Sequence, residues 1–323
     1  MEAFKIDEKD KKIIVELQNN SRASFSEIGK KVKLPKTVVA YRVKHLVDSK
    51  FIPLFCTVVS KSKFSYIQSR LFLKFHNFDD KIEERLTNFL KKKKGIHWVG
   101  SLNGCYDFCI IINSKNIEEL NEIYSDIIYT FSSYILDKEL SITTKSIYHP
   151  LKYVFEQNKQ IIEYKRKPSK NFKITPADFK IINLIKQNSR LPLLEISQKL
   201  KLTPKTVRGR IRSLIENGVI GAFRIRINHK MLGFHHFHTF LNLSGINKEF
   251  EKEIIDFISS FPSTIHIVKG TGKYDLEFES LLKSHFELYE IINQIKNKFP
   301  KNIQHADSAL IYKIYDINTV KYE

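Results

Sequence analysis

The chain has 323 residues, of which 42% are hydrophobic and 28% are charged, a composition that excludes intrinsic disorder over most of its length. It contains no apolar run near the ~18 residues of a membrane-spanning helix and no apolar leader at its start, so we expect a cytoplasmic protein without membrane contact. The formal net charge of +19 indicates a polyanionic partner, although charge alone does not distinguish DNA, RNA and a membrane surface.

The chain repeats itself at a fixed offset. Residues 6–52 and 174–220 align without a gap, with about 17 of the 47 aligned positions identical. The same offset superposes Gly-x-Tyr-Asp at 104–107 on Gly-x-Tyr-Asp at 272–275. The whole chain is therefore predicted to be a tandem duplication, with each copy about 150 residues long.

Each copy begins with three short helices. In the first copy, Ser24 to Glu27 form a capping box that opens the second helix, which runs to Val32. The third helix of the second copy is better delimited, because Thr203 can cap it, Pro204 occupies its first position and Gly218 can take the left-handed position at its end. The buried stripes are predicted at Ile13, Ile14, Leu17, Val39, Val43 and Leu46, and at Ile181, Ile182, Ile185, Ile196, Leu200, Val207, Ile211 and Leu214.

A tight turn between the second and third helices is typical of a helix-turn-helix. The segments that follow, 51–59 and 219–227, are rich in β-forming residues and are candidates for a wing. The rest of each copy reads as strand, helix, strand, strand, helix, strand. In the first copy these elements are expected at 70–76, 79–92, 96–102, 106–112, 116–131 and 138–148, and the second copy follows the same course from 236 to 315.

The predicted fold class is thus α+β, a tandem duplication of a winged helix-turn-helix followed by a βαββαβ ferredoxin-like sandwich. The expected domains are helix-turn-helix modules at 1–60 and 174–230, sandwiches at 61–156 and 231–323, and a linker at 157–173. A flexible linker of that length spans about 20–24 Å, which lets the two sandwiches pair within one chain as a pseudo-dimer. Association into a larger homo-oligomer stays open.

The positive charge is concentrated outside the sandwiches. Residues 1–60 carry a net +5, residues 174–230 a net +9 and residues 149–173 a net +5, whereas the two sandwiches together are near neutral. A phosphate backbone requires such a footprint on the helical modules. Neutral sandwiches without a basic aromatic strand also speak against RNA binding by that half of each copy.

Helical periodicity places a polar and basic face on each third helix, as a recognition helix needs for base edges and phosphates. The expected DNA-binding residues are Lys36, Thr37, Tyr41, Arg42 and Lys44 in the first copy, and Lys205, Thr206, Arg208, Arg210 and Arg212 in the second. The second module is expected to dominate affinity, since it also offers Arg224 and Arg226 on its candidate wing. Arg42 and Arg210 either reach phosphate or pair internally with Glu27 and Glu195.

The spaced residues Ile6-Asp7, Asp10, Ile13-Ile14, Asn20-Ser21-Arg22, Glu27-Ile28 and Val39-x-x-Arg-Val-x-x-Leu46, with the Gly-x-Tyr-Asp turn, resemble the Lrp/AsnC (feast/famine) transcriptional regulators. The resemblance covers nearly the whole chain, twice. It implies binding of double-stranded DNA by the helical modules, dimerisation through the sandwiches and modulation by a small molecule, often an amino acid. The chain departs from the family in having two copies, in Lys33 and Lys201 where the turn often has Gly, and in Lys50 at the cap.

The resemblance places an effector site at the Gly-x-Tyr-Asp turns, formed by Gly104, Tyr106, Asp107, Gly272, Tyr274 and Asp275. Glycine allows close approach of the backbone to a ligand, and an aspartate can bind an ammonium group. The alternative is that the glycines only form the hairpin turns and the aspartates cap them. If a single site functions, we expect it in the second copy.

A second class of protein shares this two-part architecture, the siroheme decarboxylases. That interpretation would need catalytic histidines, and the candidates are His97, His235, His236, His238 and His266. Strand alternation separates His235 from His236 and His238, which predicts no three-ligand metal cluster, and no common catalytic motif occurs. We therefore expect a regulator that is not an enzyme, with no catalytic residue, metal site or cofactor.

Overall fold

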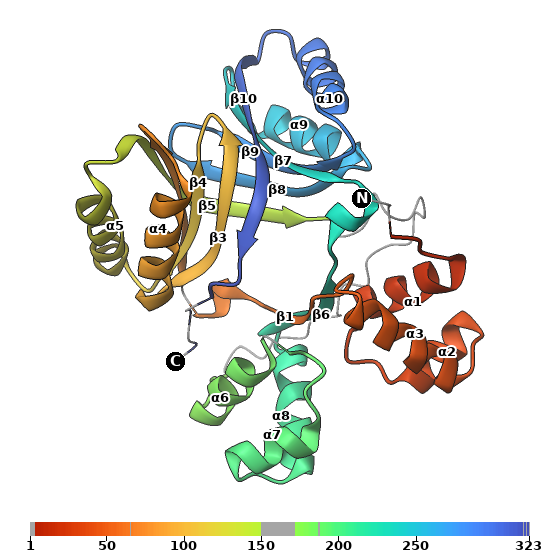
Figure 1. The fold of residues 1–323 in the computed structure, drawn as a ribbon. Helices are drawn as coiled ribbons and strands as arrows, with labels where there is room; N and C mark the ends of the chain where they lie inside the picture. Colours follow the sequence, from red (N-terminus) through yellow and green to blue (C-terminus); the bar gives the residue numbers. More distant parts are fainter. Residues whose placement is uncertain are drawn as a thin grey trace. The chain divides into compact units, whose positions relative to one another are not determined.

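The computed structural model describes residues 4–64, 66–149, 172–186, 188–318, 320 and 322. All but the last two residues of the predicted linker at 157–173 lie outside them. The chain divides into two compact units that do not follow the two copies. One unit contains the helical modules of both copies and the other contains both sandwiches (Figure 1).

The helical unit repeats its elements at the offset found in the sequence. The first copy supplies α1 (Glu8–Asn19), α2 (Phe25–Val32), α3 (Lys36–Asp48), β1 (Leu54–Val59) and the short 3-10 helix η1 (Lys61–Phe64); the second supplies α6 (Pro176–Ile185), α7 (Leu193–Leu200), α8 (Pro204–Glu216), β6 (Ile220–Arg226) and η2 (His229–Leu232). The predicted stripes are buried, apart from Leu200, which is half-buried. Amphipathic periodicity therefore located the six α-helices that the structure describes in this unit.

The helix ends confirm the capping predictions. Ser24 Oγ accepts from the Glu27 backbone N–H while the Glu27 carboxylate accepts from that of Ser24. At α8, Thr203 Oγ1 accepts from the Thr206 backbone N–H. Gly218 has a φ of 69° after α8, and Lys50 fills the equivalent left-handed position after α3 with a φ of 62°. Lys33 and Lys201, in the turns of the two modules, are left-handed as well.

The segments predicted as wings form β1 and β6, and these two strands pair with each other across the copies. The pairing is antiparallel, with Leu54 opposite Arg226 and Phe55 opposite Ile225. The loop after each first helix then contacts the other copy's strand: Ser21 N donates to Phe223 O (3.1 Å) and Ser189 N to Phe55 O (2.8 Å). The two modules are thus joined reciprocally rather than carrying independent wings.

The sandwich unit shows the expected βαββαβ order twice. It contains β2 (Ile67–Phe75), α4 (Asp80–Lys92), β3 (Ile96–Gly104), β4 (Phe108–Ser114), α5 (Ile117–Phe131) and β5 (Ile135–Tyr148), then β7 (His235–Leu243), α9 (Lys248–Ser260), β8 (Thr264–Thr271), β9 (Leu276–Leu282), α10 (His285–Lys298) and β10 (Ile303–Tyr315). The chain is therefore an α+β tandem duplication, as predicted.

The two sandwiches share one closed barrel with the strand order β10-β3-β4-β2-β5-β8-β9-β7. The last strand of each copy pairs with the second strand of the other, so that β5 joins β8 and β10 joins β3. Helices α4 and α5 cover the outer face of the first copy's sheet, and α9 and α10 cover that of the second (Figure 1). A third apolar cluster, which contains Phe72, Tyr106, Phe240 and Tyr274, lies inside the barrel between the copies.

Within the part of the chain that the structure describes, no helix is long and apolar enough to cross a bilayer.

We predict that Lys50→Gly stabilises the protein by about 0.5–1 kcal/mol. A left-handed conformation strains every residue with a Cβ, and glycine relieves this strain at the cost of a more flexible unfolded chain. Urea unfolding measures the change in the free energy of unfolding. Lys44→Gly, at an exposed position inside α3, is the control and should instead destabilise by about 1 kcal/mol; a loss of stability in both variants would contradict the prediction.

Candidate functional site

The third helices present the faces expected for DNA contact. In α3 the side chains of Lys36, Thr37 and Lys44 are exposed, and Tyr41 is 74% exposed. In α8, Lys205, Arg208 and Arg212 are exposed while Thr206 is half-buried. Arg212 forms a surface ion pair with Glu216 at 2.8 Å, an interaction that solvent weakens and that a phosphate can replace.

Arg42 and Arg210 lie beside these faces and are held inside their modules. Arg42 Nη1 contacts Asp7 Oδ2 at 2.7 Å and Asp10 Oδ1 at 2.9 Å, whereas Arg210 Nη1 contacts Asp178 Oδ1 at 3.2 Å. The prediction that Glu27 and Glu195 are the internal partners of these arginines was wrong. The capping carboxylates at the start of α1 and α6 are the acidic groups that pack beside the third helix, while Glu27 caps its own helix and Glu195 pairs with Lys199.

A second pair of arginines joins the two modules to each other. Arg190 Nη1 donates to Ser21 O (2.6 Å), and Arg22 donates to the carbonyls of Ser189 and, at 3.2 Å, Leu191. Ser21 Oγ and Ser189 Oγ meet at 2.5 Å between them. The Asn-Ser-Arg motif thus joins the two helical modules, because each arginine binds the loop of the other copy.

The two Gly-x-Tyr-Asp turns lie in the sandwich unit. Tyr106 and Tyr274 are buried and their hydroxyls are 3.4 Å apart; Tyr274 also donates to Asp307 Oδ2 at 2.9 Å. Burial raises the pKa of Tyr106 to about 12, so the hydroxyl stays protonated at neutral pH. The aromatic residues of the motif therefore contact each other across the two copies.

The aspartates of the same motif bind the neighbouring first strand. Asp107 accepts from Phe75 N (2.9 Å) and Lys74 Nζ (2.7 Å), and Asp275 accepts from Leu243 N (2.8 Å). These carboxylates tie the turn to the end of the neighbouring strand, which gives the aspartates a structural role. An effector site at these residues stays a prediction.

The glycines of the motif permit close packing of the turns against the other copy. A Cβ at Gly104, where φ is +152°, would lie 2.4 Å from Ser308 O in β10. A Cβ at Gly272 would lie 2.6 Å from Glu139 Oε1 in β5. Both contacts fall on a strand contributed by the other copy, at the joins that close the barrel.

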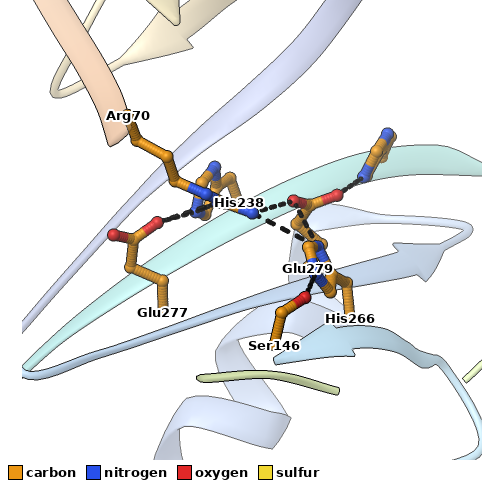
Figure 2. Close-up of polar contacts among 7 residues, drawn as sticks. Arg70, Ser146, His238, His266, Glu277 and Glu279 are labelled. Carbon is orange, nitrogen blue, oxygen red and sulfur yellow. Dashed lines mark hydrogen bonds and ion pairs between the residues drawn. The ribbon is translucent and has the colours of Figure 1, made fainter. Parts of the chain in front are cut away.

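A buried charge cluster lies inside the barrel, and we define it as Arg70, His236, His238, His266, Glu277 and Glu279. Figure 2 labels all of these residues except His236. Arg70 Nη1 lies 2.9 Å from Glu277 Oε2 and Nη2 lies 3.4 Å from Glu279 Oε1. The side chains of Arg70 and Glu277 are 3% and 1% exposed. Burial alone would raise the pKa of Glu277, but the adjacent Arg70 and His238 hold it below its ordinary value.

The three histidines complete the shell around the two carboxylates. His238 Nε2 lies 2.9 Å from Glu277 Oε2, His236 Nε2 lies 2.9 Å from Glu279 Oε2, and His266 Nδ1 lies 3.0 Å from Glu279 Oε1. His266 Nε2 is 2.8 Å from Ser146 Oγ on β5. Burial lowers the pKa of His266, so the neutral ring donates from Nδ1 to Glu279 and accepts the Ser146 hydroxyl at Nε2.

Three members of this cluster, Arg70, Glu277 and Glu279, were missed in the sequence, where the strand histidines were treated as isolated. The signal was present as alternation: His236 and His238 share one strand face, and Glu277 and Glu279 share one face of the strand paired with it. His235 lies exposed on the opposite face and His97 is not part of the cluster. Among the residues that the structure describes, no group of three or more His, Cys, Asp or Glu residues is arranged to hold a metal ion.

Comparisons with known protein families identify both helical modules as helix-turn-helix domains. Residues 6–47 match the AsnC-type helix-turn-helix domain, and residues 174–220 match a winged helix-turn-helix DNA-binding domain. The HTH-type transcriptional regulator LrpA of Bacillus subtilis is 31% identical over 143 residues, which make up 43% of this chain and 99% of that protein. The chain belongs to the Lrp/AsnC family of transcriptional regulators.

A second member, the HTH-type transcriptional regulator FL11 of Pyrococcus horikoshii, is 30% identical over 118 residues, or 36% of this chain and 77% of that protein. Each of these relatives matches less than half of the present chain, in agreement with two tandem copies. The helix-turn-helix modules and these relatives support a DNA-binding regulator.

The solved structure of the siroheme decarboxylase NirDL is similar over both copies. It has a TM-score of 0.66 and 14% sequence identity, and the match covers 97% of this chain and 94% of that chain. At this identity the likeness shows the fold alone. It nevertheless corrects the expectation that the protein is not an enzyme, since an enzyme is built on this two-copy fold.

We predict that acidification destabilises the sandwich unit in two steps. The pKa of His266 is lowered, so its contribution to stability is complete above pH 6.5 and decreases below it, where the unfolded chain binds the proton first. The pKa values of Glu277 and Glu279 are also lowered, and a second loss begins below pH 4.5 for the same reason. Thermal unfolding between pH 8 and 3 measures both steps.

His266→Gln should remove the upper step, while His76→Gln, at an exposed position, is the matched control and should keep it. A melting temperature of the wild-type protein that stays constant from pH 7 to 5 would contradict the prediction.

Proposed function

We propose that this member of the Lrp/AsnC family is a sequence-specific transcriptional regulator whose two helix-turn-helix modules bind one DNA site together. The observation that carries this proposal is that α3 and α8 expose basic faces within a single compact unit. The reciprocal arginine contacts and the β1–β6 pairing support it, because they fix the two helices in one arrangement.

The two recognition helices are not equivalent. At one position of the exposed face, α8 carries Arg208 where α3 carries Ala40, and at the next α8 carries Gly209 where α3 carries Tyr41. An arginine can read a guanine edge bidentately, and a glycine allows close approach to the groove. We therefore infer that the preferred site is an imperfect palindrome whose half-sites lie one or more helical turns apart, with the second module contributing most affinity.

We also propose that an amino acid modulates DNA binding through the Gly-x-Tyr-Asp turns, with Asp275 as the group that binds the ammonium. The resemblance of the turns to the family supports this, while the capping contact of Asp275 with Leu243 argues for a structural role. A thermal-shift screen of amino acids tests it. The proposal requires a shift in melting temperature that Asp275→Asn abolishes; no shift above noise for any amino acid would refute it.

A second candidate is a decarboxylase acting on a siroheme-type substrate. The whole-chain likeness to NirDL favours it, and so does the gathering of Arg70 and three histidines inside the barrel. All four side chains are occupied by Glu277 and Glu279, so binding of the propionate and acetate groups of a tetrapyrrole there would require the cluster to open. Anaerobic titration with siroheme, followed by its absorption bands and by mass spectrometry of the product, distinguishes this activity from DNA binding.

We predict that Arg208→Ala weakens binding to a selected DNA site by about 1–3 kcal/mol and relaxes base preference in one half-site, because a base contact is lost. Lys44→Ala should cost less and mainly lower the slope of log K against log salt by about one unit. Fluorescence anisotropy at several salt concentrations measures both effects. Arg85→Ala, in the sandwich unit, is the control; equal losses in Arg208→Ala and Lys44→Ala would contradict unequal modules.

A further inference from the structure

The buried charge cluster draws its charges from different copies. Arg70 comes from the first copy and lies between Glu277 and Glu279, both from the second. Ser146, which binds His266, also comes from the first copy. The cluster is therefore a contact between the copies, buried within the barrel that they close (Figure 2).

The repeat offset shows what the other half of this interface contains. Arg70 and His238 are equivalent residues, and Arg70 Nη1 lies 3.4 Å from His238 Nε2. The first-copy residues equivalent to Glu277 and Glu279 are Cys109 and Ile111. His236 and His266 correspond to Gln68 and Trp98. One copy thus supplies the cation and the other supplies both anions, with no matching set on the other side.

Because Arg70 faces its repeat equivalent, His238, the residue at this position affects which two copies can pair with each other. If two first copies paired in the same way, Arg70 would face a second Arg70 with Cys109 and Ile111 in place of the carboxylates. If two second copies paired, four buried glutamates would meet, each keeping the histidines of its own copy but with no arginine beside it. A buried charge without its partner is strongly destabilising, so both homotypic pairs are penalised and the mixed pair is not.

We propose that the Arg70–Glu277–Glu279 contact is a specificity device that allows the sandwich face of the first copy to pair only with that of a second copy. The partner of each face is thereby defined chemically: a face that carries a buried guanidinium accepts a face that carries two buried carboxylates. This selection excludes pairing between like copies of two chains, which a symmetric homodimer interface permits.

The experiment uses the full-length protein with a protease site inserted at residues 165–170, folded intact and then cut. The cut protein is incubated in mild urea so that the half-chains can exchange partners, and native mass spectrometry measures the mixed and like pairs. For the wild-type protein we expect an excess of mixed over like pairs of at least about 100-fold, since a missing buried partner is costly. Like pairs in comparable amounts would overturn the proposal.

Two variants separate specificity from stability. Arg70→Met with Glu277→Gln and Glu279→Gln removes the charges but keeps acceptors for the histidines, and should reduce the excess to below about 10-fold. Cys109→Glu with Ile111→Glu gives the first copy carboxylates beside its own Arg70, and should create pairs of two first copies. A folded triple variant that keeps the wild-type excess would overturn the proposal. If the triple variant does not fold, the Cys109→Glu, Ile111→Glu protein decides the test. The absence of pairs of two first copies in that protein would also overturn the proposal.

Glu83→Gln is the matched control. Glu83 also contacts the other copy, through Lys313 and Tyr315. Neither of these residues is the repeat equivalent of Glu83, so this contact does not bring a residue opposite its own equivalent. Its loss should leave the distribution of pairs unchanged, which separates a selective contact from a contact that merely holds the copies together. A comparable loss of the mixed-pair excess in Glu83→Gln would overturn the selective role of the buried charge cluster.

Discussion

The closure of one barrel from two sheets is the constraint on which the sandwich unit depends. Each copy alone has a four-stranded antiparallel sheet with two free edges, β3 and β5 in the first copy and β8 and β10 in the second. Free edges expose unpaired backbone groups and invite aggregation, and pairing β5 with β8 and β10 with β3 removes all four at once. The glycines at 104 and 272 serve the same closure, because each lets a hairpin end approach the strand that crosses from the other copy.

Closure about a pseudo-twofold axis brings equivalent residues face to face. Tyr106 meets Tyr274, Phe72 meets Phe240, and in the helical unit Ser21 meets Ser189. In a homodimer the two residues of each such pair would be identical. A charged residue on the axis would then face a residue of the same charge and could not form an ion pair with it. A duplicated chain is free of that restriction, as the pairing of Arg70 with its non-identical equivalent His238 shows.

The same divergence appears in the helical unit, where the second module carries a net +9 and the first +5. There the difference lies on exposed helix faces, whereas in the sandwich unit it is buried. The exposed differences bear on the proposed DNA contact, and the buried ones bear on the proposed selection between copies. Arg42 and Arg210 lie beside the exposed faces of α3 and α8 but are engaged by Asp7, Asp10 and Asp178, so they belong to the interior contacts of their modules.

The sequence by itself determined the duplication, the helices with their caps and the βαββαβ order. These features are local: a stripe such as Ile13, Ile14 and Leu17 follows from helical periodicity, and the caps at Ser24 and Thr203 involve residues three apart. The tertiary structure alone decided that β1 pairs with β6, that Arg42 binds Asp7 and Asp10, and that Arg70 meets Glu277 and Glu279. Alternation placed Arg70 and these glutamates on strand faces, but which faces meet depends on how the two copies close around each other. Periodicity within one segment carries no information about a partner in another segment, whether it lies 35 residues away, as Asp7 does from Arg42, or 207, as Glu277 does from Arg70.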